Sequence, residues 1–205
     1  MNLVNGVSDQ SLLKECKNIL YRCVHSKEFS TLINSRKTKE VLNSKLAIDL
    51  LNTLSTIYAI EKGYPVLKCT DGFTRDILSS RLKIRNLESE LEEMLPIIGK
   101  IIGILKPSEV VMIIDRPIPW SRRLAQKIEG FNWTSPVKVM VGKCDSLLIK
   151  LGVKDYYIAS SDVIVLQSIK KAIDLPELYV KIFKDGLAAT CDLEKMTPRW
   201  MGEIC

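Results

Sequence analysis

The sequence predicts an α/β protein with a three-layer, mostly parallel sheet and an N-terminal helical extension. Between residues 45 and 180, short runs of aliphatic and β-branched residues alternate with helical patterns. The runs are apolar throughout, which is typical of strands buried on both faces of a parallel sheet. Three of them end in an aspartate, at Asp49, Asp115 and Asp162. The fold class and the candidate site therefore come from the same pattern.

The chain has 205 residues, enough for one sizeable core and a small extension. We expect the helical extension at 1–44, the α/β domain at 45–183 and a C-terminal tail at 184–205. Within the extension, apolar residues at helical spacing predict a helix over 8–27, and the polar segment 28–44 is interpreted as a link to the first strand.

The elements of the domain are predicted from periodicity and from turn residues. Residues 52–62 suit a helix or a strand equally well. The long helix expected after residue 86 opens with an acidic first turn, which suits the helix dipole, and contains Pro96 and Gly99, which favour a bend or a break. Strands are expected at 45–49, 66–69, 110–115, 137–141, 155–159 and, at the sheet edge, 177–183. Helices are expected at 87–105, 121–129, 146–151 and 163–171.

Composition narrows the classes of partner and of site. The net charge of +6 favours a polyanionic partner such as nucleic acid, although excess lysine also promotes solubility. The six cysteines form no CxxC pair and there is one histidine, which argues against a zinc site and for reduced thiols in the cytoplasm. The most apolar window, 94–105, is shorter than the ~20 residues that cross a bilayer, so we expect no membrane contact. A homodimer through the apolar helix at 87–105 is compatible with the sequence.

The aspartates at the strand ends are the candidate site. In an open parallel sheet the carboxyl ends of the strands line the ligand crevice, so Asp49, Asp115 and Asp162 should meet there, with Asp145 just beyond the strand at 137–141. Their mutual repulsion would be neutralised by a hard cation, Mg²⁺ or Mn²⁺, which also activates water against a phosphate. The alternative interpretation is that each aspartate begins a turn or caps a helix.

Five short blocks follow one another along the chain. They are Ile48-Asp49-Leu50-Leu51-Asn52, Thr70-Asp71-Gly72-Phe73-Thr74-Arg75-Asp76, Ile114-Asp115-Arg116-Pro117, Cys144-Asp145 and Ser160-Ser161-Asp162. In this order they resemble the blocks of an uncharacterised, largely archaeal prokaryotic family that carries a PIN-like nuclease domain. The first block has lost the glycine and tyrosine that come after its aspartate in that family, and the second has lost its leading aspartate.

The resemblance implies a metal-dependent nuclease that acts on RNA, a function that comes from the fold alone. It implies that Asp49, Asp115, Asp145 and Asp162 are the catalytic metal ligands. Supporting roles fall to Asn52, Asp71, Asp76 and Ser161. Phosphate contacts are expected from Arg75, Arg116, Arg122, Arg123 and Lys127.

Two other functions compete with the nuclease. One is a non-catalytic nucleic-acid-binding module that keeps the fold and has a weakened site. The other is a phosphatase, which ranks third because an Asp-x-Asp pair, the usual source of the covalent intermediate, is missing after the strand at 45–49.

Overall fold

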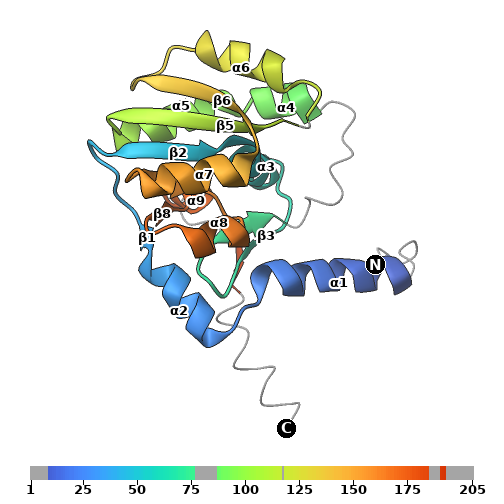
Figure 1. Ribbon diagram of the computed structural model, residues 1–205. Coiled ribbons are helices and arrows are strands. Elements are labelled where there is room, and N and C mark those ends of the chain that lie inside the picture. The colour runs from blue at the N-terminus through green and yellow to red at the C-terminus, as the bar shows by residue number, and fades with distance from the viewer. Residues whose placement is uncertain (1–8, 77–86, 117, 185–189, 193–205) are drawn as a thin grey trace.

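The computed structural model describes residues 9–76, 87–116, 118–184 and 190–192 (Figure 1). Pro117 and most of the expected tail at 184–205 lie outside the described residues. The main element is a six-stranded sheet in which every pair of neighbours is parallel. Its strands, in spatial order, are β1 (Lys37–Thr38), β8 (Ala172–Ile173), β7 (Tyr157–Ala159), β2 (Lys45–Asp49), β5 (Glu109–Asp115) and β6 (Val137–Gly142).

A second sheet has three strands and lies beside the first. It contains the strand expected at 66–69 together with two strands that the sequence did not predict. In spatial order they are β4 (Thr74–Asp76), β3 (Val66–Lys68) and β9 (Thr190–Asp192). β3 is antiparallel to β4 and parallel to β9.

Helices cover both faces of the large sheet, so the α/β class and the three layers are confirmed (Figure 1). Two hydrophobic clusters, one on each face, hold the layers together. The first face carries α3 (Leu50–Glu61), α4 (Leu87–Glu92), α5 (Leu95–Leu105), α6 (Ser121–Glu129) and α9 (Leu175–Phe183). The second face carries α2 (Lys27–Ser35), α7 (Cys144–Val153) and α8 (Val163–Ser168).

The alternation of side chains along the central strands decides which face receives the strand-end aspartates. In β2, Leu46 and Ile48 belong to the cluster on the α3 face, whereas Ala47 belongs to the cluster on the α7 face. Since successive side chains point to opposite faces, Asp49 shares the face of Ala47. The same rule in β5 places Asp115 with Val111 and Ile113, again on the α7 face.

Several expected boundaries were wrong. Residues 177–183 form α9 instead of an edge strand, because Asp174 caps this helix by accepting a hydrogen bond from the Glu177 amide and Pro176 occupies its first turn. The segment expected to be a polar link contains α2, capped by Ser26, and β1, which pairs with β8 in the large sheet. The helical extension therefore ends before residue 44.

The long helix expected at 87–105 is two helices, α4 and α5, with Pro96 in the first turn of α5. Most apolar residues of α5 face the core: Ile98, Ile101 and Ile102 are fully buried, whereas Ile104 is 49% exposed. The homodimer through this helix stays a prediction. Among the described helices, none combines the length and the hydropathy needed to span a membrane.

Helix α1 (Asp9–Cys23) extends away from the body of the molecule (Figure 1). Its C-terminal end is attached where Cys23 packs against Leu67 and Cys69 of the small sheet region. The main-chain amide of Thr70 donates a hydrogen bond to the carbonyl of Cys23 over 2.9 Å, and Tyr21 remains 85% exposed. The small sheet therefore anchors α1 to the rest of the chain.

Candidate functional site at the carboxyl edge of the sheet

The four predicted aspartates lie along one edge of the large sheet. Asp49 and Asp115 are the last residues of the adjacent strands β2 and β5. Asp145 is in the first turn of α7, which comes after β6, and Asp162 caps α8, which comes after β7. All four strands are parallel, so their carboxyl ends lie at the same edge. We call these four residues the carboxylate edge.

Asp49 is the most enclosed member, with 8% of its surface exposed. The Ser160 hydroxyl donates a hydrogen bond to its Oδ2 over 2.9 Å. Burial raises the pKa of Asp49 to about 6, and the charge of Asp162 acts in the same direction. Hydrogen bonds from Ser160 and Cys144 act in the opposite direction and lower it. At neutral pH this carboxyl group is still largely ionised, but it is easily protonated.

The other members influence one another through their charges. Partial burial raises the pKa of Asp145, and the negative charges of Asp162 and Asp115 raise it further. Burial and the charges of Asp49, Asp145 and Asp115 also raise the pKa of the Cys144 thiol. These charge effects place the four carboxylates within electrostatic reach of one another.

The carboxylates also have local roles, in agreement with the alternative interpretation. Asp162 accepts hydrogen bonds on Oδ1 from the amides of Ile164 and Val165, which is a helix cap. Asp115 accepts one on Oδ1 from the amide of Arg116. Each of these bonds uses one of the two oxygens of the carboxylate.

The residues at this edge fit Mg²⁺ or Mn²⁺ in their chemistry, because their donors are carboxylate and hydroxyl oxygens. Within the described residues, no group of three or more His, Cys, Asp or Glu side chains lies close enough together to hold a metal ion. This spacing does not suit a closed protein cage of the zinc type. Magnesium is usually held by one or two carboxylates plus water and substrate phosphates, which this arrangement can provide.

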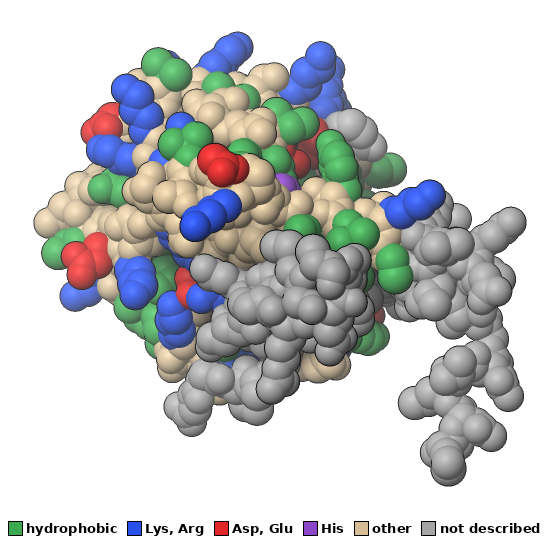
Figure 2. Space-filling model, turned by 90° about the horizontal axis from the view of Figure 1, so that it is seen from below, with side chains coloured by type: hydrophobic (Ala, Val, Ile, Leu, Met, Phe, Trp, Pro, Cys, Tyr) green, Lys and Arg blue, Asp and Glu red, His purple; other side chains and the backbone are tan. Residues whose placement is uncertain are grey.

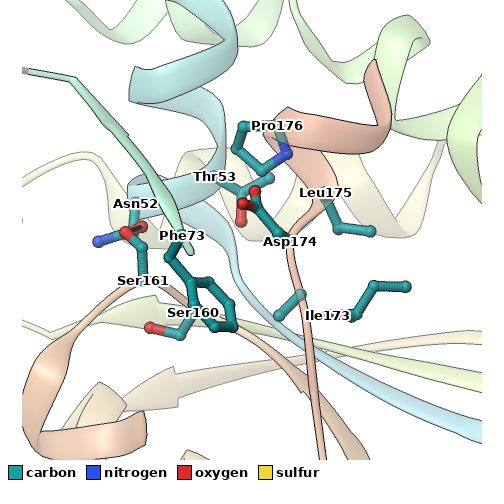
Figure 3. A pocket seen from close by; sticks show the side chains of 10 residues that line it. Asn52, Thr53, Phe73, Ser160, Ser161, Ile173, Asp174, Leu175 and Pro176 are labelled. Atoms are coloured by element: carbon teal, nitrogen blue, oxygen red, sulfur yellow. Dashed lines mark hydrogen bonds between the residues drawn. The ribbon is translucent and has the colours of Figure 1, made fainter. Parts of the chain in front are cut away.

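A small pocket lies beside the carboxylate edge, between the β7–α8 loop and the start of α9 (Figure 3). Ser161 donates a hydrogen bond from its hydroxyl to Oδ1 of Asn52 over 2.8 Å, and the two side chains face one another there. Phe73 and Asp174 line the same pocket. Asn52 and Ser161 are thus bonded to each other in a pocket beside Asp162, and their supporting role stays a prediction.

The second sequence block is a buried structural network that does not reach the carboxylate edge. Asp71 pairs with both terminal nitrogens of Arg75, over 2.8 and 2.6 Å, and the two side chains are 0% and 1% exposed. The carboxylate of Asp76 accepts hydrogen bonds from the hydroxyls of Ser55 and Thr56. The prediction that Arg75 contacts phosphate is therefore wrong, since its guanidinium is inaccessible.

Arg75 instead positions the site. Its Nε donates a hydrogen bond to the main-chain carbonyl of Ser161 over 2.8 Å. Although burial by itself lowers the pKa of Arg75, the bonds and charge of Asp71 raise it, so this guanidinium is permanently charged. The block at 70–76 looks like a ligand-binding motif in the sequence. In the structure it supports the loop that carries Ser160, Ser161 and Asp162.

The basic residues after β5 are only partly directed toward the carboxylate edge. Arg116 is exposed directly beside Asp115. The other three lie on α6, which packs on the opposite face of the sheet, where Arg123 pairs with Glu88 and Lys127 pairs with Glu92 of α4. Arg122 is exposed on the same helix. These pairs reduce the free positive charge of α6.

Two residues of the site were not singled out from the sequence. Ser160 holds Asp49, and Cys144 packs beside the same carboxylate. The position of Ser160 directly after the strand was a usable signal, because a hydroxyl at that place can reach the end of the neighbouring strand. Cys144 gave no such signal, since a buried cysteine is most often a small core residue.

The comparisons with known proteins assign the chain to a family whose function is unknown. Neither the search of curated proteins nor the search of solved structures found a match. A family model described as "Domain of unknown function (DUF5616)" matches residues 38–178, which include all four residues of the carboxylate edge. The match covers well over half of the chain, and the chain therefore belongs to this family of domains of unknown function.

Proposed function

We propose that this protein is a PIN-like, metal-dependent nuclease that hydrolyses phosphodiester bonds in RNA at the carboxylate edge. The observation that carries the proposal is the position of Asp49, Asp115, Asp145 and Asp162 at the carboxyl ends of four neighbouring parallel strands. The charges of Asp162 and Asp115 help to raise the pKa of Asp145, so these carboxylates repel one another. A cation bound at this edge would relieve that repulsion.

The chemistry of the proposed reaction divides between the ion and the chain. A bound Mg²⁺ or Mn²⁺ would polarise a phosphoryl oxygen and lower the pKa of a coordinated water. Asp115 and Asp145 supply accessible carboxylates, and Ser160 orients the buried Asp49 through its hydrogen bond. Arg116, exposed next to Asp115, is placed to contact a phosphate of the substrate.

No histidine base is needed in this scheme. The single histidine, His25, lies on the segment between α1 and α2, where its Nε2 is 3.6 Å from the Asp71 carboxylate. Asp71 belongs to the buried Arg75 network, so His25 is grouped with the structural support of the loop. The proposed catalysis depends on carboxylates and a metal ion alone.

The experiment is cleavage of an end-labelled single-stranded RNA by the wild-type protein and by Asp115→Asn, in Mn²⁺ and in EDTA. We expect Mn²⁺-dependent cleavage that Asp115→Asn reduces at least roughly 100-fold, because a carboxylate that would hold the metal ion is removed. Isothermal titration should show a matching loss of Mn²⁺ binding. The DNA of the same sequence tests the preference for RNA.

Asp155→Asn is the matched control. Asp155 is an exposed aspartate at the opposite edge of the sheet, paired with Lys171, and its positive φ of 68° is one that asparagine adopts readily. This variant should cleave and bind Mn²⁺ as the wild type does. Equal cleavage by Asp115→Asn and Asp155→Asn would refute the proposal.

A non-catalytic nucleic-acid-binding module is the second candidate. It is favoured by the helix cap that occupies Oδ1 of Asp162 and by the spacing of the carboxylates among the described residues. RNA that binds equally well in EDTA and is never cut would establish this function instead.

A further inference from the structure

A second, basic pocket lies beside β1, the outer strand on the side of the same sheet away from β6. It is open to solvent, has a volume of about 260 Å³, and is lined by residues of α2, β1, β3, the β3–β4 turn and α9. This volume lies just below the range of drug-sized ligand pockets. We call it the lysine pocket, after Lys37, Lys39, Lys68 and Lys181.

The lysines of this pocket exceed the carboxylates that they meet. Lys37 pairs with Asp174 over 3.2 Å and with Glu177 over 2.7 Å. Lys181 and Lys68 approach the same Glu177, over 2.6 and 3.6 Å. Four lysines against two carboxylates leave a net charge of +2 in the pocket.

This excess of positive charge is larger than one structural ion pair requires. Lys37, whose side chain is 11% exposed, by itself joins β1 to Asp174 and to Glu177 of α9. Lys68 arrives from the small sheet and adds positive charge around a carboxylate that is already paired. Although burial alone would raise it, the hydrogen bonds and charges of Lys181 and Lys37 lower the pKa of Glu177 to about 2.

The lysine pocket is close to the carboxylate edge. Lys37 Nζ lies 4.8 Å from the centroid of the Phe73 ring, and Phe73 and Asp174 line the small pocket next to Ser160 and Ser161 (Figure 3). In the sheet, β1 is separated from β2 by β8 and β7, a distance of roughly 14 Å at the usual spacing of strands. Figure 2, the view from the side of α2, shows groups of basic side chains on this face.

We infer that the lysine pocket binds a phosphate group of a single-stranded nucleic acid whose neighbouring segment lies on the carboxylate edge. The positive pocket would attract the backbone that the negative edge repels, and it would set the direction of the strand. The identity of the ligand rests on the proposed function, whereas the anion site rests on the lysines themselves.

The test is RNA binding in EDTA, measured by fluorescence anisotropy, for the triple variant Lys39→Ala/Lys68→Ala/Lys181→Ala. Lys37 is kept because it joins β1 to α9. We expect affinity to fall roughly 5- to 20-fold, and the slope of log K against log salt to decrease by about 0.7 for each lost phosphate contact. Oligonucleotides with a 5′-phosphate and with a 5′-hydroxyl distinguish a terminal phosphate from an internal phosphodiester.

The control has the same change of charge. Lys150→Ala/Lys154→Ala/Lys170→Ala removes three exposed lysines, of which Lys154 and Lys170 lie at the amino edge of the sheet. If both triple variants weaken RNA binding equally, the effect is one of net charge and the inference is wrong.

A second measurement does not depend on a variant. Inorganic phosphate titrated into the ¹⁵N-labelled wild-type protein should shift the amide resonances of Lys39, Lys68 and Gly72, and those at the amino edge should stay constant. Absence of these shifts would overturn the anion site. The two proposals fail separately: weakened binding without any Mn²⁺-dependent cleavage keeps the lysine pocket, and intact binding with Asp115-dependent cleavage keeps the nuclease.

Discussion

Arg75 donates a hydrogen bond from Nε to the carbonyl oxygen of Ser161 over 2.8 Å, across 86 positions of the sequence. This bond joins the small sheet to the β7–α8 loop of the large one. Asp71 fixes the guanidinium from the other side. The placement of Ser160 and Asp162 at the carboxylate edge therefore depends on a buried charge pair that touches neither of them.

We predict that Arg75→Met destabilises the protein by about 3–5 kcal/mol, because it leaves the fully buried Asp71 carboxylate without its counter-charge. Thermal and urea unfolding measure the change. In the folded fraction, Mn²⁺ binding should also weaken, since the carbonyl of Ser161 loses its donor.

Two variants separate these effects. Asp71→Asn/Arg75→Met removes both charges, so it should be more stable than Arg75→Met alone. Arg123→Met breaks an exposed pair with Glu88 and should cost less than about 1 kcal/mol. An Arg75→Met protein as stable as Arg123→Met would show that the buried pair does not support the loop.

Asp49→Asn should stabilise the protein in EDTA at pH 8 and weaken its Mn²⁺ binding. Burial raises the pKa of Asp49 to about 6 in the folded state, above the value of 3.8 for an unburied aspartate. The folded wild type therefore binds the proton more tightly than the unfolded chain, and its stability falls as pH rises from about 4 through about 6. Asparagine lacks this penalty, which is about 3 kcal/mol at pH 8.

The measurement is the free energy of unfolding of both proteins between pH 4 and pH 8. The advantage of Asp49→Asn should grow with pH and level off above about pH 7. Asp155→Asn, at an exposed site, provides the baseline. If Asp49→Asn is less stable than the wild type at pH 8, the prediction is wrong. The hydrogen bonds of the ionised carboxylate would then stabilise the folded protein by more than the burial of the charge destabilises it.

Gly72→Ala should destabilise the protein by about 1 kcal/mol more than Gly63→Ala. Both glycines have positive φ, 78° and 69°, so alanine is strained at each by about 1–2 kcal/mol. A Cβ at Gly63 would meet no atom within 4 Å, whereas one at Gly72 would lie 2.5 Å from Oδ1 of Asn34.

The free energies of unfolding from urea titrations give this difference. The double variant Asn34→Ala/Gly72→Ala removes the contact and should lose the additional cost, which leaves only the backbone strain. If Gly72→Ala and Gly63→Ala are equally destabilising, the Asn34 side chain moves aside freely. The contact between Asn34 and residue 72 then contributes nothing to the free energy of unfolding.

Local patterns predicted the elements whose period is clear. The runs that became β2 and β5 are apolar between their end residues, and the helix with alternating basic and apolar residues was predicted with its observed bounds, Ser121–Glu129. The pattern failed where tertiary contacts decide. Residues 177–183 were predicted as a strand, and the cap by Asp174 makes them part of the helix Leu175–Phe183. Thr74–Asp76 is a strand because it pairs with β3, and its sequence alone is that of a turn.

By itself, the sequence determined the α/β class and the four aspartates at strand ends, because parallel strands buried on both faces need continuous apolar runs and leave only the residues just beyond their ends open to solvent. Only the tertiary structure decided the roles of the charged residues. Arg75 is enclosed by Asp71 and Ser161, and Lys37 is enclosed by Asp174 and Glu177, and in each case the partners are set by packing. Whether a charge meets solvent, a ligand or a buried counter-charge depends on residues distant in the chain, and no local pattern records them.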